Sequence, residues 1–227
     1  MIDKLIVKQT LDGTTTLYDK ELDEHYHSTH GSLQEAIHVF IKNGLEKVLE
    51  QRADELENIN ILEVGFGTGL NCLLSLSYDE GINVFINYTG IEPHPVPIEL
   101  INKMNYNFDE LQKKLFSKIH QSKWNLTNSI TTKFSLNKQQ VNFQDFKNKN
   151  KYDLIFFDAF GPRVEKFLWN KDVFKKAYEI LNNNGLLVTY CAKGQVRRDL
   201  EEVGFFVERL NGPVGKREML RANKIVK

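Results

Sequence analysis

Short apolar runs alternate with amphipathic segments from residue 59 onward, and this alternation constrains the fold more than any other feature. The runs INILEVGF, NVFINYTGIEP, YDLIFFDAFGP and GLLVTYCA read as strands, and KFSLNKQQVNFQDF reads as a weaker strand and turn. Helical spacing predicts helices over 69–78, 97–118 and 170–182. Such alternation predicts an α/β fold with a mostly parallel sheet. FFVERLNG and REMLRANK predict an antiparallel hairpin at its edge.

Residues 1–58 are expected to form an extension that packs on a domain of residues 59–227. LIVKQTLDGTTTLY, with Asp12-Gly13 at its centre, has the pattern of a β-hairpin. A helix is predicted to follow Ser32 and to end near Gly44. The polar segment between them contains His25, His27 and His30, whose spacing lacks a supporting acid or cysteine cluster, so we expect a polar lid or pocket lining and no metal.

Composition sets limits on location and partners. The 227 residues include 30 basic and 30 acidic side chains, which leaves room for a local basic patch but does not indicate a polyanion partner. No apolar run approaches the ~20 residues of a membrane span, and MIDKLIVKQT is not a signal peptide, so we expect a cytoplasmic protein. Cys72 and Cys191 fit no metal spacing and are expected to be buried thiols.

The stretch ILEVGFGTGLN, residues 61–71, places three alternating glycines directly after an apolar run. Glycine lets the backbone approach a ligand closely, whereas a plain turn would gain nothing from three of them. A dinucleotide site would need G-x-G-x-x-G, but Leu70 occupies the last glycine position, and no phosphate-loop lysine follows. The pattern acid-x-Gly-x-Gly-x-Gly resembles motif I of class I S-adenosylmethionine (SAM) methyltransferases, in which Glu63 would meet the cofactor's ammonium group through the backbone or a water.

Three further acids follow later strands. Glu92 ends the strand YTGIEP and could accept both ribose hydroxyls of a nucleoside. Asp145 follows the weaker strand and could face an adenine amino group, although an aspartate in a loop is common in any case. Asp158 ends the strand YDLIFF, two residues before Phe160, and these two side chains could orient an amine and stack on a base; a turn-capping aspartate is the alternative.

The segments EVGFGTGLN, DAFGPRVEKFLW and AKGQVRRDLEEVGFFVERLNGPVGKREMLRA, in that order, resemble the methyltransferase domain of the MnmC family. Ser28, Gly31 and Glu35, spaced S-x-x-G-x-x-x-E, also resemble the entry segment of that family, and the resemblance covers about residues 10–222. It implies a class I SAM-dependent methyltransferase fold with a Rossmann-like sheet. It also implies methyl transfer from SAM to 5-aminomethyl-2-thiouridine at the tRNA wobble position, which gives 5-methylaminomethyl-2-thiouridine. The chain has no room for the oxidase domain of bifunctional members, so it resembles a stand-alone, MnmD-type enzyme with a possible separate oxidase acting upstream.

The resemblance and the charges together give a set of expected site residues. Asp158 and Phe160 are expected at the acceptor. The expected cofactor residues are Glu63, Gly65, Phe66, Gly67, Gly69, Asn71, Glu92 and Asp145. Arginine and lysine hold phosphates, although several here could equally be solvated surface charges. The expected substrate residues are Ser28, Gly31, Glu35, Lys193, Arg197, Arg198, Lys216 and Arg217.

Two other functions remain open. An aminopropyltransferase similar to spermidine synthase would use the same fold and a related sulfonium, but Arg163 and Lys166 stand where more acids would be expected. A non-catalytic RNA-binding module would not need Glu63, Glu92 and Asp158 together. SAM binding would discriminate between an enzyme and such a module.

Overall fold

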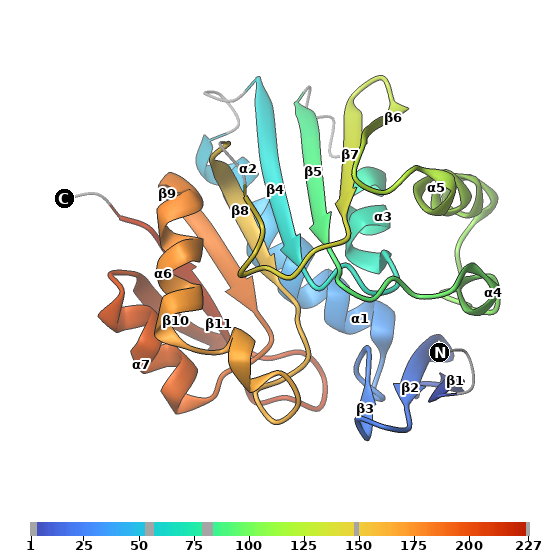
Figure 1. Cartoon of the computed structure of the whole chain (residues 1–227), viewed down its shortest axis with the longest axis horizontal. Coiled ribbons are helices and arrows are strands. Elements are labelled where there is room, and N and C mark those ends of the chain that lie inside the picture. The colour runs from blue at the N-terminus through green and yellow to red at the C-terminus, as the bar shows by residue number, and fades with distance from the viewer. Residues whose placement is uncertain (1–3, 53–56, 79–83, 148–149, 226–227) are drawn as a thin grey trace.

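The computed structural model describes residues 4–52, 57–78, 84–147 and 150–225. An eight-stranded sheet runs through the molecule in the order β10-β11-β9-β8-β4-β5-β7-β6 (Figure 1). The five strands from β9 to β7 are parallel, and β11 and β6 are antiparallel to their neighbours. The bounds are β4 Asn58–Val64, β5 Phe85–Ile91, β6 Thr127–Thr131, β7 Phe134–Gln139, β8 Tyr152–Phe157, β9 Leu181–Thr189, β10 Phe206–Asn211 and β11 Glu218–Asn223.

The strand order reverses between β4 and β8. The chain passes from β4 to β5 and β7 on one side, then returns to place β8 on the other side of β4. Ligands of parallel α/β sheets bind at the carboxyl ends of the strands beside such a reversal. The antiparallel pair β10–β11 confirms the predicted C-terminal hairpin.

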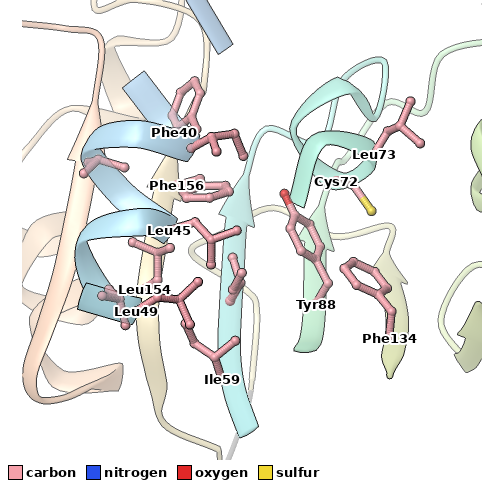
Figure 2. Close-up of a cluster of buried hydrophobic side chains, with 14 of the residues drawn as sticks. Phe40, Leu45, Leu49, Ile59, Cys72, Leu73, Tyr88, Phe134, Leu154 and Phe156 are labelled. Atoms are coloured by element: carbon pink, nitrogen blue, oxygen red, sulfur yellow. The ribbon is translucent and has the colours of Figure 1, made fainter. Parts of the chain in front are cut away.

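Helices cover both faces of the sheet, and each face has its own hydrophobic core. One core includes Tyr88, Phe134 and Phe156 and packs against the N-terminal helix and α3 (Figure 2). Cys72 and Cys191 are buried free thiols, as predicted. Strand β8 is buried along its whole length because helices cover both of its faces. The helices that follow the N-terminal helix are α3 Leu70–Ser77, α4 Ile98–Ile101, α5 Glu110–Gln121, the 3₁₀-helix η3 Lys166–Leu168, α6 Lys171–Ile180 and α7 Gly194–Glu202.

The N-terminal helix is longer than predicted. It runs without interruption through α1 (Ser32–Ala36), a π-helical segment η2 (Ile37–Leu45) and α2 (Glu46–Arg52). The prediction that it ends near Gly44 was wrong. A Cβ on Gly44 would lie 3.1 Å from side-chain atoms of both Phe156 and Val188, so this glycine allows close helix–sheet packing. Phe40, Leu45 and Leu49 from this helix face the sheet in Figure 2.

The single helix predicted over 97–118 was also wrong. The structure has the short helix α4, an irregular segment and then α5. Asn107 in the irregular segment has a φ of 57°, which does not fit a continuous helix. Asp109 then starts α5 with a capping box, in which its side chain accepts the Gln112 N–H at 2.8 Å. Strand β6 was not predicted because its residues TNSIT are polar and half-exposed.

The predicted N-terminal hairpin is present as β1 (Leu5–Gln9) and β2 (Thr15–Asp19), paired from Leu5↔Asp19 to Gln9↔Thr15. A short third strand, β3 (Glu24–His25), pairs with β2. This small sheet lies beyond the carboxyl ends of β4 and β5 (Figure 1). No helix among the described residues is long and apolar enough to cross a membrane.

Candidate active site

A cavity of about 590 Å³ opens at the carboxyl ends of β4, β5 and β8, beside the reversal of strand order. Its walls include the glycine loop, the N-terminal segment around β3, the loops after β5, β7, β8 and β9, and the β10–β11 loop. The cavity therefore lies where the topology of an open parallel sheet favours a ligand.

The glycine loop holds conformations that other residues rarely adopt. Gly65, Gly67 and Gly69 have φ angles of 91°, 50° and 75°. The Gly65 and Phe66 N–H groups both donate to the Ile91 carbonyl, at 3.0 and 2.9 Å, which fixes the loop against the end of β5. The Phe66 ring packs over Gly90, where a Cβ would be only 2.2 Å from the ring. Its side chain thus supports the loop from the core side.

Asn71 connects the first strand of the site with the acid after β8. Its Nδ2 donates to Glu63 Oε1 and to Asp158 Oδ2, at 2.8 Å each. The hydroxyl of Tyr88 donates to the other oxygen of Glu63 at 2.9 Å. Burial, with the Asp158 carboxyl nearby, raises the pKa of Glu63 well above its ordinary value. Two acids and an amide are therefore held as one buried polar unit.

The same unit retains one free acceptor. Asn71 Oδ1 is buried, and no described group donates to it. Buried polar atoms are normally hydrogen-bonded, so this oxygen fits a donor on a ligand such as an ammonium group. The cradle of three positive-φ glycines next to it also fits a ligand that approaches the backbone. The site therefore fits SAM, the expected cofactor.

The structure places Glu92 at the cavity and Asp145 away from it. The Glu92 carboxylate accepts the Gly67 N–H at 3.1 Å and the His94 N–H at 3.0 Å, and burial raises its pKa. Asp145 is exposed and does not line the cavity, whereas Asn142 and its neighbour Phe143, from the same turn, do. A turn was predicted after this strand, but a sequence pattern does not determine which side chain of a turn lines a cavity.

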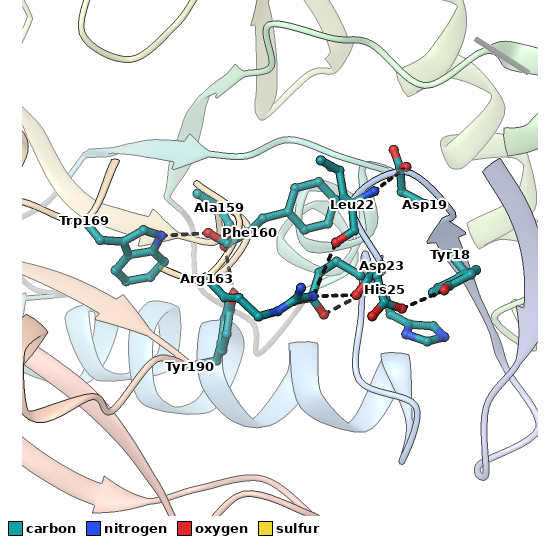
Figure 3. Close-up of polar contacts among 11 residues, drawn as sticks. Tyr18, Asp19, Leu22, Asp23, His25, Ala159, Phe160, Arg163, Trp169 and Tyr190 are labelled. Atoms are coloured by element: carbon teal, nitrogen blue, oxygen red, sulfur yellow. Dashed lines mark hydrogen bonds and ion pairs between the residues drawn. The ribbon is translucent and has the colours of Figure 1, made fainter. Parts of the chain in front are cut away.

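Phe160 is fixed by contacts on three sides. Its N–H donates to Glu165 Oε2 at 2.9 Å. Its carbonyl accepts from Trp169 Nε1 at 2.7 Å (Figure 3). Its ring meets that of Tyr26 edge to face, with the centroids 4.9 Å apart. Tyr190 donates its hydroxyl to the Ala159 carbonyl at 2.9 Å. The loop beside Asp158 is therefore held in one conformation at the cavity wall.

Burial and the nearby Glu35 carboxylate raise the pKa of Asp158 well above its ordinary value. The hydrogen bond from Asn71 and the charge of Lys216 act in the opposite direction. A carboxylate whose pKa is raised is a stronger base, which suits proton exchange with an amine.

The expected substrate residues separate into two groups. Ser28, Glu35, Lys193 and Lys216 line the cavity. Lys216 forms an ion pair with Glu35 and lies over the Tyr190 ring, 3.9 Å from its centroid. Glu35 Oε2 also accepts the Ser28 N–H at 2.8 Å. Lys216 is thus engaged inside the protein, which differs from the expected role of a free phosphate-binding cation.

The other four expected substrate residues do not line the cavity. Gly31 lies under Asp12, whose Oδ2 would be 2.6 Å from a Cβ at that position. Arg197 is 3.6 Å from Glu201, and Arg198 donates to Gln195 at 2.9 Å. Arg217 is exposed.

Sequence reasoning missed the contacts that close the N-terminal segment over the cavity. Arg163 hydrogen-bonds the Asp23 carbonyl, as Figure 3 shows. It also pairs with Glu24 at 3.1 Å. Tyr26 and Glu165 also line the cavity, and neither was expected to. Arg163 and Glu165 lie within DAFGPRVEKFLW, so the segment was correctly singled out although these two side chains were not.

All three histidines of the polar segment line the cavity, as expected of a lid or pocket lining. His27 Nε2 lies 2.8 Å from the Thr68 hydroxyl. The His25 ring lies against the ring of Tyr18, with the centroids 4.7 Å apart. Among the described residues, no group of three histidine, cysteine or acidic side chains could hold a metal ion.

The chain is similar to known proteins in both sequence and structure. The model of a family described as S-adenosyl-L-methionine-dependent methyltransferase matches residues 102–225. The bifunctional protein MnmC of tRNA 5-methylaminomethyl-2-thiouridine biosynthesis from Leptospira interrogans is 32% identical over 223 residues, covering 93% of this chain and 34% of that protein. The curated relatives matched first are longer, since the chain spans 59% of one and 34% of another.

Solved structures give the same fold. The crystal structure of MNMC2 from Aquifex aeolicus is 25% identical and has a TM-score of 0.78, with 98% of this chain and 71% of that chain covered. Spermidine synthase from Thermotoga maritima is 15% identical with a TM-score of 0.57, covering 99% of this chain and 74% of that chain. The second likeness is one of fold alone. The expected class I SAM-dependent methyltransferase fold is confirmed.

Proposed function

Because the chain belongs to the S-adenosyl-L-methionine-dependent methyltransferase family, we propose that it methylates the amine of 5-aminomethyl-2-thiouridine at the tRNA wobble position. The product would be 5-methylaminomethyl-2-thiouridine. The observation that carries the proposal is the hydrogen-bonded link from Glu63 through Asn71 to Asp158. This link ties the glycine loop to an acid suited to an amine. The names of the MnmC relatives and the MNMC2 structure support the choice of acceptor.

On the cofactor side, the glycine loop, Asn71 Oδ1 and the Glu92 carboxylate would hold SAM. Glu92 retains acceptor capacity for ribose hydroxyls, because each of its oxygens receives a single backbone N–H. Bound SAM supplies a methyl group that its sulfonium already activates. The protein's own contribution is then to position the acceptor and to exclude water.

On the acceptor side, Asp158 would accept a hydrogen bond from the amine and take its proton. The amine must be neutral to attack, and the raised pKa of Asp158 favours proton uptake. The fixed ring of Phe160 would lie beside the uracil. The acid thus orients the nucleophile from rigid strand β8, and the aromatic limits its freedom.

The rest of the assignment concerns partners and organisation. Lys193 at the cavity, with exposed Arg198 and Arg217 outside it, would contact tRNA phosphates. A separate enzyme would supply the aminomethyl group, and both reactions would take place in the cytoplasm. We also propose that residues 1–58 act as an extension that covers the acceptor end of the domain over 59–227.

The test is methyl transfer from labelled SAM to tRNA that stops at the aminomethyl stage, with the product identified by nucleoside mass spectrometry. Asp158→Asn should lower kcat by a factor of about 10²–10⁴, because it removes proton uptake but can still accept from Asn71. Asp172→Asn, on the exposed first turn of α6, is the matched control and should leave turnover unchanged. Full activity of Asp158→Asn would contradict its role.

A failed test would still discriminate between functions. SAM binding without tRNA methylation would retain the family but reject this acceptor, and polyamines would be tested next. A protein that binds tRNA but not SAM would be a non-catalytic RNA-binding module.

A further inference from the structure

Glu165 is an acid of the cavity wall to which the proposed reaction gives no role. It precedes η3 in the loop after β8, and its Oε2 accepts the Phe160 N–H at 2.9 Å. Burial, and then the nearby Glu92 carboxylate, raise the pKa of Glu165 to about 7. The Glu165 side chain therefore lies near Glu92 in the cavity. It also holds the backbone of Phe160.

The charged groups around Glu165 do not neutralise it. Glu92 approaches from the end of β5, and Tyr26 approaches from the N-terminal segment. His94 interacts with Glu92, and the Arg163 guanidinium is bound to the N-terminal segment at Asp23 and Glu24. Among the described residues, no basic side chain forms an ion pair with Glu165. Two neighbouring half-buried carboxyl groups without a counter-ion favour a ligand that brings positive charge.

We propose that Glu165 is a positioning residue that couples the positive charge of SAM to the conformation of Phe160. The inference rests on membership of the methyltransferase family and on the contacts of Glu165. It does not depend on tRNA as the acceptor.

The coupling follows from one carboxyl group serving two purposes. With no cation in the cavity, Glu165 is protonated in part of the molecules at neutral pH. A sulfonium in the cavity favours the ionised form, so the carboxyl proton leaves to solvent. The resulting carboxylate accepts a stronger hydrogen bond from the Phe160 N–H than the neutral acid does. SAM binding thus strengthens the hydrogen bond that helps to hold Phe160 beside Asp158 before the acceptor enters.

The experiment compares SAM with S-adenosylhomocysteine, which shares every group except the methyl and the sulfonium charge. Titration calorimetry at pH 7, in buffers of different ionisation enthalpy, measures the protons released on binding. The wild-type protein should release more protons with SAM than with S-adenosylhomocysteine. Between pH 6 and 8 its affinity for SAM should rise about tenfold, as expected when a group of pKa 7 must ionise, with a smaller rise for S-adenosylhomocysteine.

Glu165→Gln should abolish the difference in proton release between the two ligands, because glutamine can still accept from Phe160 but cannot ionise. Glu24→Gln is the matched control, since Glu24 is another acid of the cavity wall but is paired with Arg163. The control should keep the difference.

Equal proton release for SAM and S-adenosylhomocysteine in the wild-type protein would overturn the proposal, and this measurement needs no variant to fold. A difference that persists in Glu165→Gln, or that disappears equally in Glu24→Gln, would also overturn it. If the ligand difference is present but tRNA is not methylated, the role of Glu165 stands and the proposed acceptor falls.

Discussion

Gly65→Ala is the substitution whose effect the geometry determines most directly. Gly65 has a φ of 91°, and a Cβ built there would be 2.6 Å from the Asp158 carbonyl oxygen. It would also be 2.9 Å from the Asp158 carbonyl carbon and 3.0 Å from the Ala159 nitrogen. All three atoms are backbone, so no side chain can rotate away. The loop after β8 must move, and Asp158 must move with it.

The expected cost has two parts. A side chain at a positive φ costs about 1–2 kcal/mol. Forcing an extra carbon into a packed position costs a further ~1–3 kcal/mol. Gly13→Ala separates them, because Gly13 has a φ of 80° but nothing lies within 4 Å of its Cβ position. We therefore expect Gly65→Ala to lower the free energy of unfolding by about 2–5 kcal/mol, and Gly13→Ala by only about 1–2 kcal/mol.

Urea unfolding of the two variants and the wild type measures these free energies, and calorimetry measures SAM affinity. Gly65→Ala should weaken SAM binding at least tenfold, or about 1.4 kcal/mol, whereas Gly13→Ala should leave it unchanged. If Gly65→Ala does not fold while Gly13→Ala does, the clash is supported. Equal destabilisation of the two variants, with SAM affinity intact in both, would refute the argument from backbone contact.

Three further predictions concern two ion pairs and two histidines. Breaking the Glu35–Lys216 pair leaves a buried charge, so a double-mutant cycle with Glu35→Gln and Lys216→Met should give a coupling energy of about 1–3 kcal/mol in urea unfolding, and zero coupling would contradict the contact. Arg163→Ala removes an exposed pair, and amide exchange in the N-terminal sheet should accelerate about 2–5-fold while exchange in β4 is unchanged. Burial lowers the pKa of both His27 and His120 to about 4, so between pH 6.5 and 4 the unfolded chain binds more protons and stability falls with falling pH. Replacing both histidines with glutamine should reduce that loss between pH 7 and pH 5; an unchanged pH dependence would exclude them as its source.

The local sequence pattern was sufficient to predict the glycine loop and the strand before it. Alternating glycines after a buried strand commonly form a tight loop at the end of that strand. Gly65, Gly67 and Gly69 all have the positive φ that glycine allows. The position of Asp158 was predicted for the same reason, because an acid after six buried residues must lie at the end of a central strand. Both predictions depend on spacing along a single segment.

Predictions that needed the packing of distant segments were less successful. Gly44 was interpreted as a helix end, but its missing side chain serves the contact with Phe156. Lys216 was interpreted as a phosphate contact, but it pairs with Glu35 across the cavity. Asp145 was chosen from a turn whose inward residues are Asn142 and Phe143. In each case the residue type was informative, while its partner lay far away in the sequence.

Different interactions hold the different parts of the site, and this affects how an acceptor can enter the cavity. Glu63 and Asp158 lie at the ends of central strands, and Asn71 lies on α3, which packs in the main core. The exposed pair Arg163–Glu24, in contrast, joins segments at the rim. Ion pairs near the surface contribute little free energy, and segments with few buried apolar contacts open before a sheet unfolds. A bulky acceptor can therefore enter by opening the rim, while the acids that would bind cofactor and amine stay in place.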